Sequence, residues 1–245
     1  MDISSYIDFT LLKPTTTERE IIDLCNAAHK NSYYSVCVSS SFVPLAKQLL
    51  LDSDAKVCTA IGFPLGSMST QSKIYEAEKA IEDGADEIEM VLNLGYMKSR
   101  NYVSVLKDIS DVKRAIGKTP LKVIVEISEL NKNEIIKACE ICLDAKADII
   151  KTSTGFSKSG ATLTAVKIIK KTLRDRAKIE ASGGIDDLDI ALKYIDAGAD
   201  RIDTSSIIKS GYSSRQIRNT KVYKDYIETV LNSNNNQSIS TNKQV

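Results

Sequence analysis

The sequence predicts a single α/β domain whose parallel strands close into a barrel. Eight short apolar runs alternate along the chain with segments long enough to form amphipathic helices, as in a series of βα units. Three of these units share one joint, a Gly-Ala-Asp or Lys-Ala-Asp tripeptide followed by an apolar strand, at 84–91, 146–153 and 198–205. We therefore expect a (β/α)8 barrel, the TIM barrel fold, over residues 1–231.

Each expected strand is four to seven residues long and rich in β-branched side chains. The eight strands are expected at Ile7–Leu11, Val36–Ser39, Val57–Ile61, Glu87–Asn93, Lys122–Ile127, Ile149–Thr152, Lys178–Ala181 and Arg201–Thr204. Such short strands suit a barrel, in which each strand crosses the core once.

Two of the expected helices begin with a capping box, because Thr17 and Asn131 each precede a glutamate by three residues. Further helices are expected at Phe42–Leu51, Thr70–Asp83, Asn101–Ile116, Thr162–Arg174, Asp187–Ala197 and Ser213–Leu231. The stretch after them, residues 232–245, is rich in Asn, Ser and Gln and almost without apolar side chains. We expect it to be a disordered polar C-terminal tail.

The composition argues against several partners. The chain has 245 residues, with 33 Lys and Arg against 32 Asp and Glu, so it lacks the positive field that binds nucleic acid. No run approaches the roughly 20 apolar residues of a membrane span. Its five cysteines are an odd number without framework spacing, which favours free thiols in the cytoplasm. Cys139 and Cys142 lie in a helical pattern without a second ligand pair, so we expect no metal site.

Charged residues recur at one position of the apolar strands. Glu89, Lys151 and Asp203 each follow the aspartate of a joint by three residues, on the fourth, sixth and eighth strands. Alternate strands of a barrel contribute to the same interior layer, so these side chains should meet inside, and Glu180 on the seventh strand should join them. A lone charge near a strand more often faces solvent, but three equivalent charges favour a site.

A lysine inside a barrel is suited to nucleophilic attack on a carbonyl, because a desolvated amine can be neutral near pH 7. Lys151 is therefore the candidate nucleophile. The loops after the sixth, seventh and eighth strands are rich in glycine and hydroxyl groups that can bind a polyol or an anion. The candidate substrate-binding residues in them are Thr152, Gly155, Gly183, Gly184, Ser205 and Ser206.

Segments from Tyr6 to Ser206 resemble, in the same order, the deoxyribose-phosphate aldolases. The matching segments are Ile7–Pro14, Val36–Val38, Phe42–Lys47, Val57–Gly66, Asp86–Val91, Leu121–Glu126, Ile150–Phe156 and Ala181–Ile185. The resemblance implies a TIM barrel enzyme, a Schiff-base (class I) aldehyde-lyase without metal or cofactor. Its members reversibly cleave 2-deoxy-D-ribose 5-phosphate to glyceraldehyde 3-phosphate and acetaldehyde. By resemblance Lys151 forms the imine, and Glu89 replaces an aspartate that relays protons.

Three residues depart from the family pattern and add negative charge. Glu180 stands where the family has a second lysine, and a carboxylate beside Lys151 favours its ammonium form. Asp203 replaces a glycine and Asp186 an arginine, so both should oppose a bound phosphate unless they point elsewhere or are paired. Glu180 and Asp203 either enter the pocket or pair with basic neighbours such as Lys178 and Arg201. We include Glu180 with Lys151 and Glu89 as catalytic candidates, and Asp186 and Asp203 as substrate-binding candidates.

Two alternatives to the family reaction remain open. One is imine chemistry on a different substrate, either unphosphorylated or carrying an amine that would suit the added carboxylates. The other is a binding barrel without catalytic turnover. The expected partner is a small aldehyde or sugar. A homodimer is one option for the assembly. The sequence does not determine the oligomeric state, since no expected helix has an outward apolar stripe that can be told from core packing.

Overall fold

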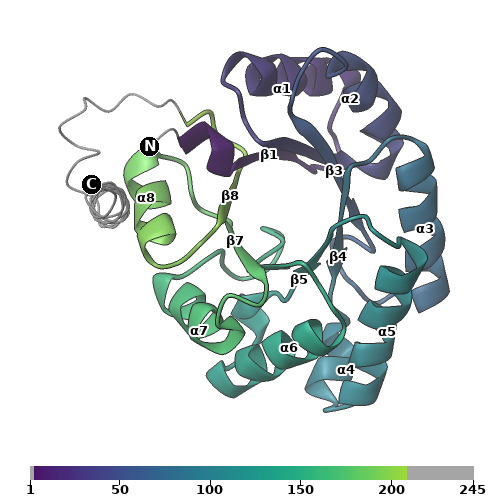
Figure 1. Cartoon of the computed structure of the whole chain (residues 1–245), viewed down its shortest axis with the longest axis vertical. Coiled ribbons are helices and arrows are strands. Elements are labelled where there is room, and N and C mark those ends of the chain that lie inside the picture. The colour runs from purple at the N-terminus through teal and green to yellow at the C-terminus, as the bar shows by residue number, and fades with distance from the viewer. Residues whose placement is uncertain (1–2, 209–245) are drawn as a thin grey trace, which may run out of the picture. The chain divides into compact units, whose positions relative to one another are not determined.

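The computed structural model describes residues 3–208, and over this range it confirms the predicted barrel. Eight parallel strands close into one ring, each paired with its neighbours in chain order (Figure 1). They are β1 Ile7–Leu11, β2 Ser35–Ser39, β3 Lys56–Ile61, β4 Glu87–Val91, β5 Leu121–Ile124, β6 Ile149–Lys151, β7 Lys178–Ser182 and β8 Arg201–Thr204. The predicted last helix, Ser213–Leu231, and the predicted tail at 232–245 lie outside the described residues.

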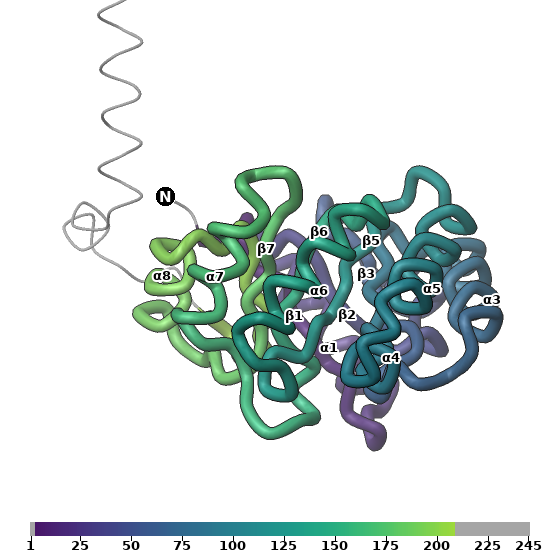
Figure 2. The backbone as a smooth tube through the Cα atoms, turned by 90° about the horizontal axis from the view of Figure 1, so that it is seen from below, coloured from purple at the N-terminus to yellow at the C-terminus, as the bar shows by residue number. Residues whose placement is uncertain are grey.

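Helices form a layer around the strands, and α7, α6 and α5 follow one another along one side of the barrel (Figure 2). The α-helices are α1 Glu18–Lys30, α2 Val43–Leu49, α3 Thr70–Glu82, α4 Leu94–Lys98, α5 Tyr102–Ala115, α6 Lys132–Asp144, α7 Leu163–Leu173 and α8 Leu188–Asp196. Three 3-10 turns, η1 Ile3–Tyr6, η2 Ser40–Phe42 and η3 Ile127–Glu129, complete the described elements. The capping boxes at Thr17 and Asn131 are both formed.

Two predicted strands end two or three residues earlier than expected, each for a local reason. The fourth stops at Val91 because Asn93 caps α4, a helix that the sequence pattern did not predict. The fifth stops at Ile124 because Glu126 adopts a left-handed backbone conformation with φ 55°, which a β-strand cannot contain. Both interruptions lie at the carboxyl end of the barrel, where the loops turn outward.

The repeated joint aspartates fix where strands begin. The carboxylate of Asp148 accepts the backbone N–H of Leu121 at 2.8 Å, while its own N–H donates to the Leu121 carbonyl at 3.0 Å. Asp86 and Asp200 make the same pair of bonds to the strands before them. Each aspartate thus aligns its strand with the preceding one. This alignment places the residue three positions later inside the barrel.

The loops after β6 and β7 meet at two glycines. A Cβ on Gly160 would lie 2.2 Å from the carbonyl oxygen of Gly183 and 2.4 Å from its carbonyl carbon. Gly183 itself has φ 91°, a conformation that favours glycine. The two loops therefore approach each other as closely as they do because neither carries a side chain at this point.

We expect Gly160→Ala to lower the free energy of unfolding by about 1–3 kcal/mol, since backbone atoms must move to admit the methyl group. Denaturation in urea measures this change. Gly95→Ala is the matched control, because Gly95 has a nearest neighbour at 3.3 Å, the side chain of Asn93. A Gly160→Ala protein as stable as the control would show that the loops can separate without cost.

Candidate active site

Lys151 lies at the end of β6 with its side chain pointing into the barrel, and the residue is only 2 % exposed. Its Nζ lies 2.8 Å from Glu89 Oε2 and 3.2 Å from Glu180 Oε1, and it also donates to Asp203. The β6–β7 register sets Lys151 directly beside Glu180. The four residues expected to meet are therefore in contact, with one ammonium among three carboxyl groups.

A second buried cation, Lys122 of β5, lies on the other side of Glu180. Its Nζ is 2.8 Å from Glu180 Oε2, 2.7 Å from Asp8 Oδ2 and 3.1 Å from Glu87 Oε2. The sequence analysis missed Lys122 and Asp8 as members of the cluster. The signal was present, because both are charged residues within apolar strands, but no repeat marked them.

Arg201 of β8 completes this cluster, and the acids that it binds are Asp8 and Glu87. It donates to Asp8 at 2.8 Å and to Glu87 at 3.3 Å, and its guanidinium stacks on the Tyr34 ring at 3.1 Å from the centroid. Asp203 thus pairs with Lys151, and Glu180 lies beside both Lys151 and Lys122. Lys178 is exposed and pairs with neither acid.

The strands bury more acidic than basic groups among the described residues. The carboxyl groups are Asp8, Glu87, Glu89, Glu180 and Asp203, and the cations are Lys122, Lys151 and Arg201. A buried charge without a partner is costly, so a proton held by one of these acids relieves the excess. Glu180 is the best placed, because neither of its oxygens has a well-oriented hydrogen bond although lysines lie close to both.

The pKa directions agree with this charge count. Burial raises the pKa of Glu180 to about 8 despite the attraction of Lys122, and the repulsion of Asp8 adds to the increase. Burial also raises the pKa of Asp203. Burial alone would lower the pKa of Lys151, but Asp203, Glu89 and Glu180 outweigh it and hold that pKa well above its ordinary value. Lys151 therefore rests as an ammonium that has acceptors for its proton in direct contact.

The loop after Lys151 is held by Glu126, which lies in the left-handed conformation. Its Oε2 accepts the backbone N–H of Thr154 at 3.1 Å and also the Thr154 hydroxyl. Thr152 is fully buried beneath the loop, where its hydroxyl lies 3.2 Å from the Ser182 carbonyl oxygen. Thr152 thus orders the loop, and its position differs from the substrate-facing one that we expected.

A cavity of about 300 Å³ opens at the carboxyl end of the strands, and Lys151 reaches it through its contact with Asp203, one of the lining residues. Asp203 lies at its floor and is already engaged by Lys151 and by the Thr10 hydroxyl at 2.7 Å. Asp186 is exposed at the rim and accepts from the Ser206 hydroxyl at 3.2 Å. The other expected substrate-binding residues in its lining are Gly155, Gly183, Gly184 and Ser205, whereas Ser206 reaches the site through Asp186.

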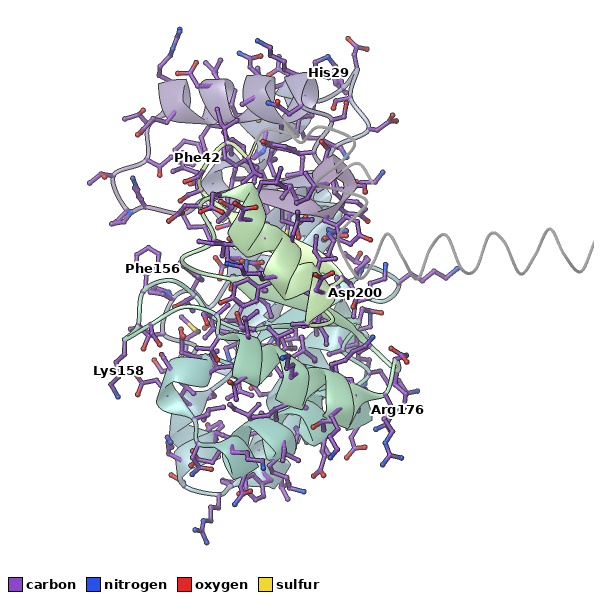
Figure 3. All side chains as sticks on the ribbon, turned by 90° about the vertical axis from the view of Figure 1, so that its left-hand side faces the viewer. His29, Phe42, Phe156, Lys158, Arg176 and Asp200 are labelled. Atoms are coloured by element: carbon purple, nitrogen blue, oxygen red, sulfur yellow. The ribbon has the colours of Figure 1, made fainter. Side chains whose placement is uncertain are left out.

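A larger cavity, of about 690 Å³, lies at the amino end of the strands, near Arg176 and Asp200. Figure 3 shows these two residues at one end of the barrel and Phe156 and Lys158 at the other. Asp148 and Asp200, which line it, use their carboxylates to bind strand N–H groups. We therefore assign the chemistry to the smaller cavity, whose lining includes Asp203, a partner of Lys151.

Two clusters have the donor atoms of a metal site, but neither is arranged to take a cation. Glu89, Glu180 and Asp203 surround the Lys151 ammonium, which already occupies their centre. In the other cluster, a hydrogen bond to Cys58 and burial raise the pKa of the Cys37 thiol well above its ordinary value. Cys139 and Cys142 are buried free thiols and belong to no such cluster within residues 3–208.

Comparison with known proteins decides the family. A family model described as DeoC/LacD family aldolase matches residues 5–215. The chain belongs to the DeoC/LacD family of aldolases. A deoxyribose-phosphate aldolase of Finegoldia magna is 50 % identical over 85 % of this chain and 98 % of its own. One of Carboxydothermus hydrogenoformans is 50 % identical over 83 % and 91 %.

Solved structures of family members have the same fold. The structure titled "QR15, an Aldolase" is 45 % identical and superposes with a TM-score of 0.81, covering 84 % of this chain and 92 % of that one. A deoxyribose phosphate aldolase from Aeropyrum pernix, described as a unique tetramer, is 30 % identical with a TM-score of 0.77 over 84 % and 87 %. Within the part of this aldolase that the structure describes, no helix has the length and apolarity to cross a membrane.

The raised pKa of Glu180 makes part of the stability depend on pH. A glutamate titrates near 4.5 in an unfolded chain, whereas Glu180 titrates at about 8 in the fold. The folded state holds the proton more tightly, so this stabilisation is fully present below pH 4.5 and is lost as the pH rises to about 8. Urea denaturation between about pH 5 and pH 8 should show the wild type losing stability relative to Glu180→Gln.

Glu78→Gln is the control for this measurement, since Glu78 is an exposed glutamate on α3. The difference in the free energy of unfolding between Glu78→Gln and the wild type should stay constant over the same pH range. If the Glu180→Gln difference also stayed constant, Glu180 would be charged in the fold throughout this range.

Proposed function

We propose that this protein is a Schiff-base aldolase that reversibly cleaves 2-deoxy-D-ribose 5-phosphate to glyceraldehyde 3-phosphate and acetaldehyde. The observation that carries the proposal is Lys151, a buried lysine at the end of β6 that touches three carboxyl groups, one of which, Asp203, lines a cavity of about 300 Å³. The substrate follows from the names of the relatives that are 50 % identical. Lys151, Glu89 and Glu180 are the proposed catalytic residues, and Asp203, which we expected only to bind substrate, joins them as a proton acceptor.

Imine formation begins when Lys151 gives its proton to a neighbouring carboxylate. Glu89 and Asp203 are the acceptors, since both contact Nζ. The free amine then attacks the aldehyde carbon of the open-chain sugar, and the carbonyl oxygen gains a proton to become a hydroxyl. Glu180, neutral below about pH 8, is placed to protonate this hydroxyl so that it leaves as water.

Carbon–carbon cleavage follows from the iminium. A base removes the proton of the hydroxyl on the second carbon from the iminium carbon. The bond between that hydroxyl-bearing carbon and the carbon next to the iminium then breaks, and its electrons move into an enamine on Lys151. The three-carbon aldehyde phosphate departs. Protonation of the enamine carbon and addition of water then release acetaldehyde and restore the amine. The carboxyl groups of Glu89 and Asp203 return the protons that they accepted.

Reductive trapping tests the nucleophile. Incubation with acetaldehyde and borohydride should add one ethyl group to Lys151, because borohydride reduces the imine to a stable secondary amine. Peptide mass spectrometry locates the adduct. The matched control is Lys73, which is fully buried and paired with Asp108 at 2.6 Å. It should remain unmodified, and Lys151→Arg should abolish the adduct.

Failure to trap any adduct over a range of pH would overturn both imine hypotheses and leave the binding barrel as the function. An adduct on a different lysine would overturn the assignment of Lys151 alone.

A second candidate function, aldol cleavage of an unphosphorylated or amine-bearing substrate, is favoured by Asp186. This carboxylate lies at the rim of the cavity beside Gly183 and Gly184, whose backbone N–H groups are the best candidates to bind an anion. Asp203 no longer argues for this alternative, because Lys151 and Thr10 engage its carboxylate. The single charge of Asp186 weakens phosphate binding, and the family reaction remains our first proposal.

Comparing deoxyribose 5-phosphate with deoxyribose distinguishes the two candidates. We expect kcat/KM to favour the phosphate ester, and Asp186→Asn to increase that preference by about two- to fivefold, the size of an exposed charge interaction. Asp189→Asn is the control, since Asp189 is exposed on α8 and does not line the cavity. A wild-type preference for the unphosphorylated sugar would instead support the second candidate.

We also propose a cytoplasmic location, which the five buried free thiols support, because such thiols are typical of a reducing compartment. A homodimer stays a prediction, which a molar mass from light scattering would test. The relative from Aeropyrum pernix is described as a tetramer, so the assembly can differ between family members.

A further inference from the structure

Glu180 bridges two lysines that lie on opposite sides of it. Its Oε1 is 3.2 Å from Lys151 and its Oε2 is 2.8 Å from Lys122. Neither lysine lines the cavity, but Lys151 contacts Asp203, which does, whereas Lys122 is fully buried and contacts no residue of the lining. Glu180 therefore connects the reactive amine with a cation that no substrate in the cavity can reach.

Lys122 is held in place by Asp8. Asp8 accepts from it at 2.7 Å, and Asp8 is itself bound by Arg201 at 2.8 Å and by the Ser35 hydroxyl at 2.5 Å. Burial opposes ionisation of Asp8, yet Lys122 and Arg201 hold its pKa well below the usual range. Asp8 is thus a permanent anion, and Lys122 a permanent cation, within the same buried cluster.

We propose that Lys122 and Asp8 are positioning residues that together determine whether Glu180 carries a charge, and through Glu180 how firmly Lys151 is held as an ammonium. The second half of this inference rests on the proposed function of Lys151. The first half does not, because it concerns Glu180 in the protein without substrate.

The two residues act on Glu180 with opposite signs. Lys122 attracts a negative charge on Glu180, and Asp8 repels it. A charged Glu180 adds a third carboxylate beside Lys151 and opposes release of its proton, whereas a neutral Glu180 does not. The opposing charges of Lys122 and Asp8 therefore influence the Lys151 amine through one side chain, that of Glu180.

Other titratable or charged groups lie next to Glu180 or next to its partners. They are Cys37 of β2, Cys58 of β3, Glu87 and Glu89 of β4, Lys151 of β6, and Arg201 and Asp203 of β8. Burial raises the pKa of the Cys58 thiol, and a hydrogen bond and burial do the same for Cys37, so both are neutral where Glu180 titrates. The remaining groups are common to all the variants below, and only Lys122 or Asp8 changes.

Carbon-13 NMR of protein labelled at the glutamate carboxyl carbon measures the titration directly, with Glu180→Gln to assign the signal. We expect Lys122→Met to raise the apparent pKa of Glu180 by about one unit or more, and Asp8→Asn to lower it by a similar amount. Lys122→Arg keeps the charge and should leave the value near that of the wild type. Lys73→Met removes an equally buried lysine outside the cluster and should cause no shift.

Opposite shifts support the inference, because a purely structural role would produce none or the same shift in both variants. Shifts of the same sign, or no shift, would overturn it. If Lys122→Met does not fold, Asp8→Asn against Lys122→Arg still decides, since only the first should lower the value. Trapping of Lys151 by acetaldehyde is measured separately. Opposite shifts without any adduct would preserve the control of Glu180 while ending the aldolase proposal.

Discussion

The charge excess inside the barrel is the constraint on which the site depends. Strand residues bury a larger number of carboxyl groups than of cations, and water cannot screen the difference. Each cation must therefore serve several acids, as Lys122 and Lys151 both do, and one acid gains by holding a proton. Glu180 lies between the two lysines and is the natural place for that proton. Its position links the structural part of the cluster to the reactive part.

Much of the fold was predictable because its cues are local. The joint at Asp86, Asp148 and Asp200 marks where strands begin, and the three-residue offset to Glu89, Lys151 and Asp203 then gave the interior layer without knowledge of the tertiary structure. What sequence reasoning missed depends on contacts across the barrel. Lys122 and Asp8 lie 114 positions apart in the chain, and nothing near either residue indicates the other.

The meaning of the substituted acids also needed the structure. From the sequence, a carboxylate at Asp203 was expected to oppose phosphate, but in the structure this carboxylate binds Lys151 and Thr10. Asp186 does reach the rim of the cavity. Asp203 and Asp186 are both unexpected acids in the sequence, yet Asp203 contacts the Lys151 amine and Asp186 lies at the rim of the cavity. The contacts of each side chain in the structure distinguish the two.

The joint aspartates have a consequence for how such a barrel can change over time. Each one ties its strand to the strand before it through a carboxylate and a backbone N–H, and not through the helix that connects them. Insertions or deletions in the outer helices can then leave the interior positions in register. Charges within the barrel can then be exchanged one at a time on a frame whose alignment is set independently.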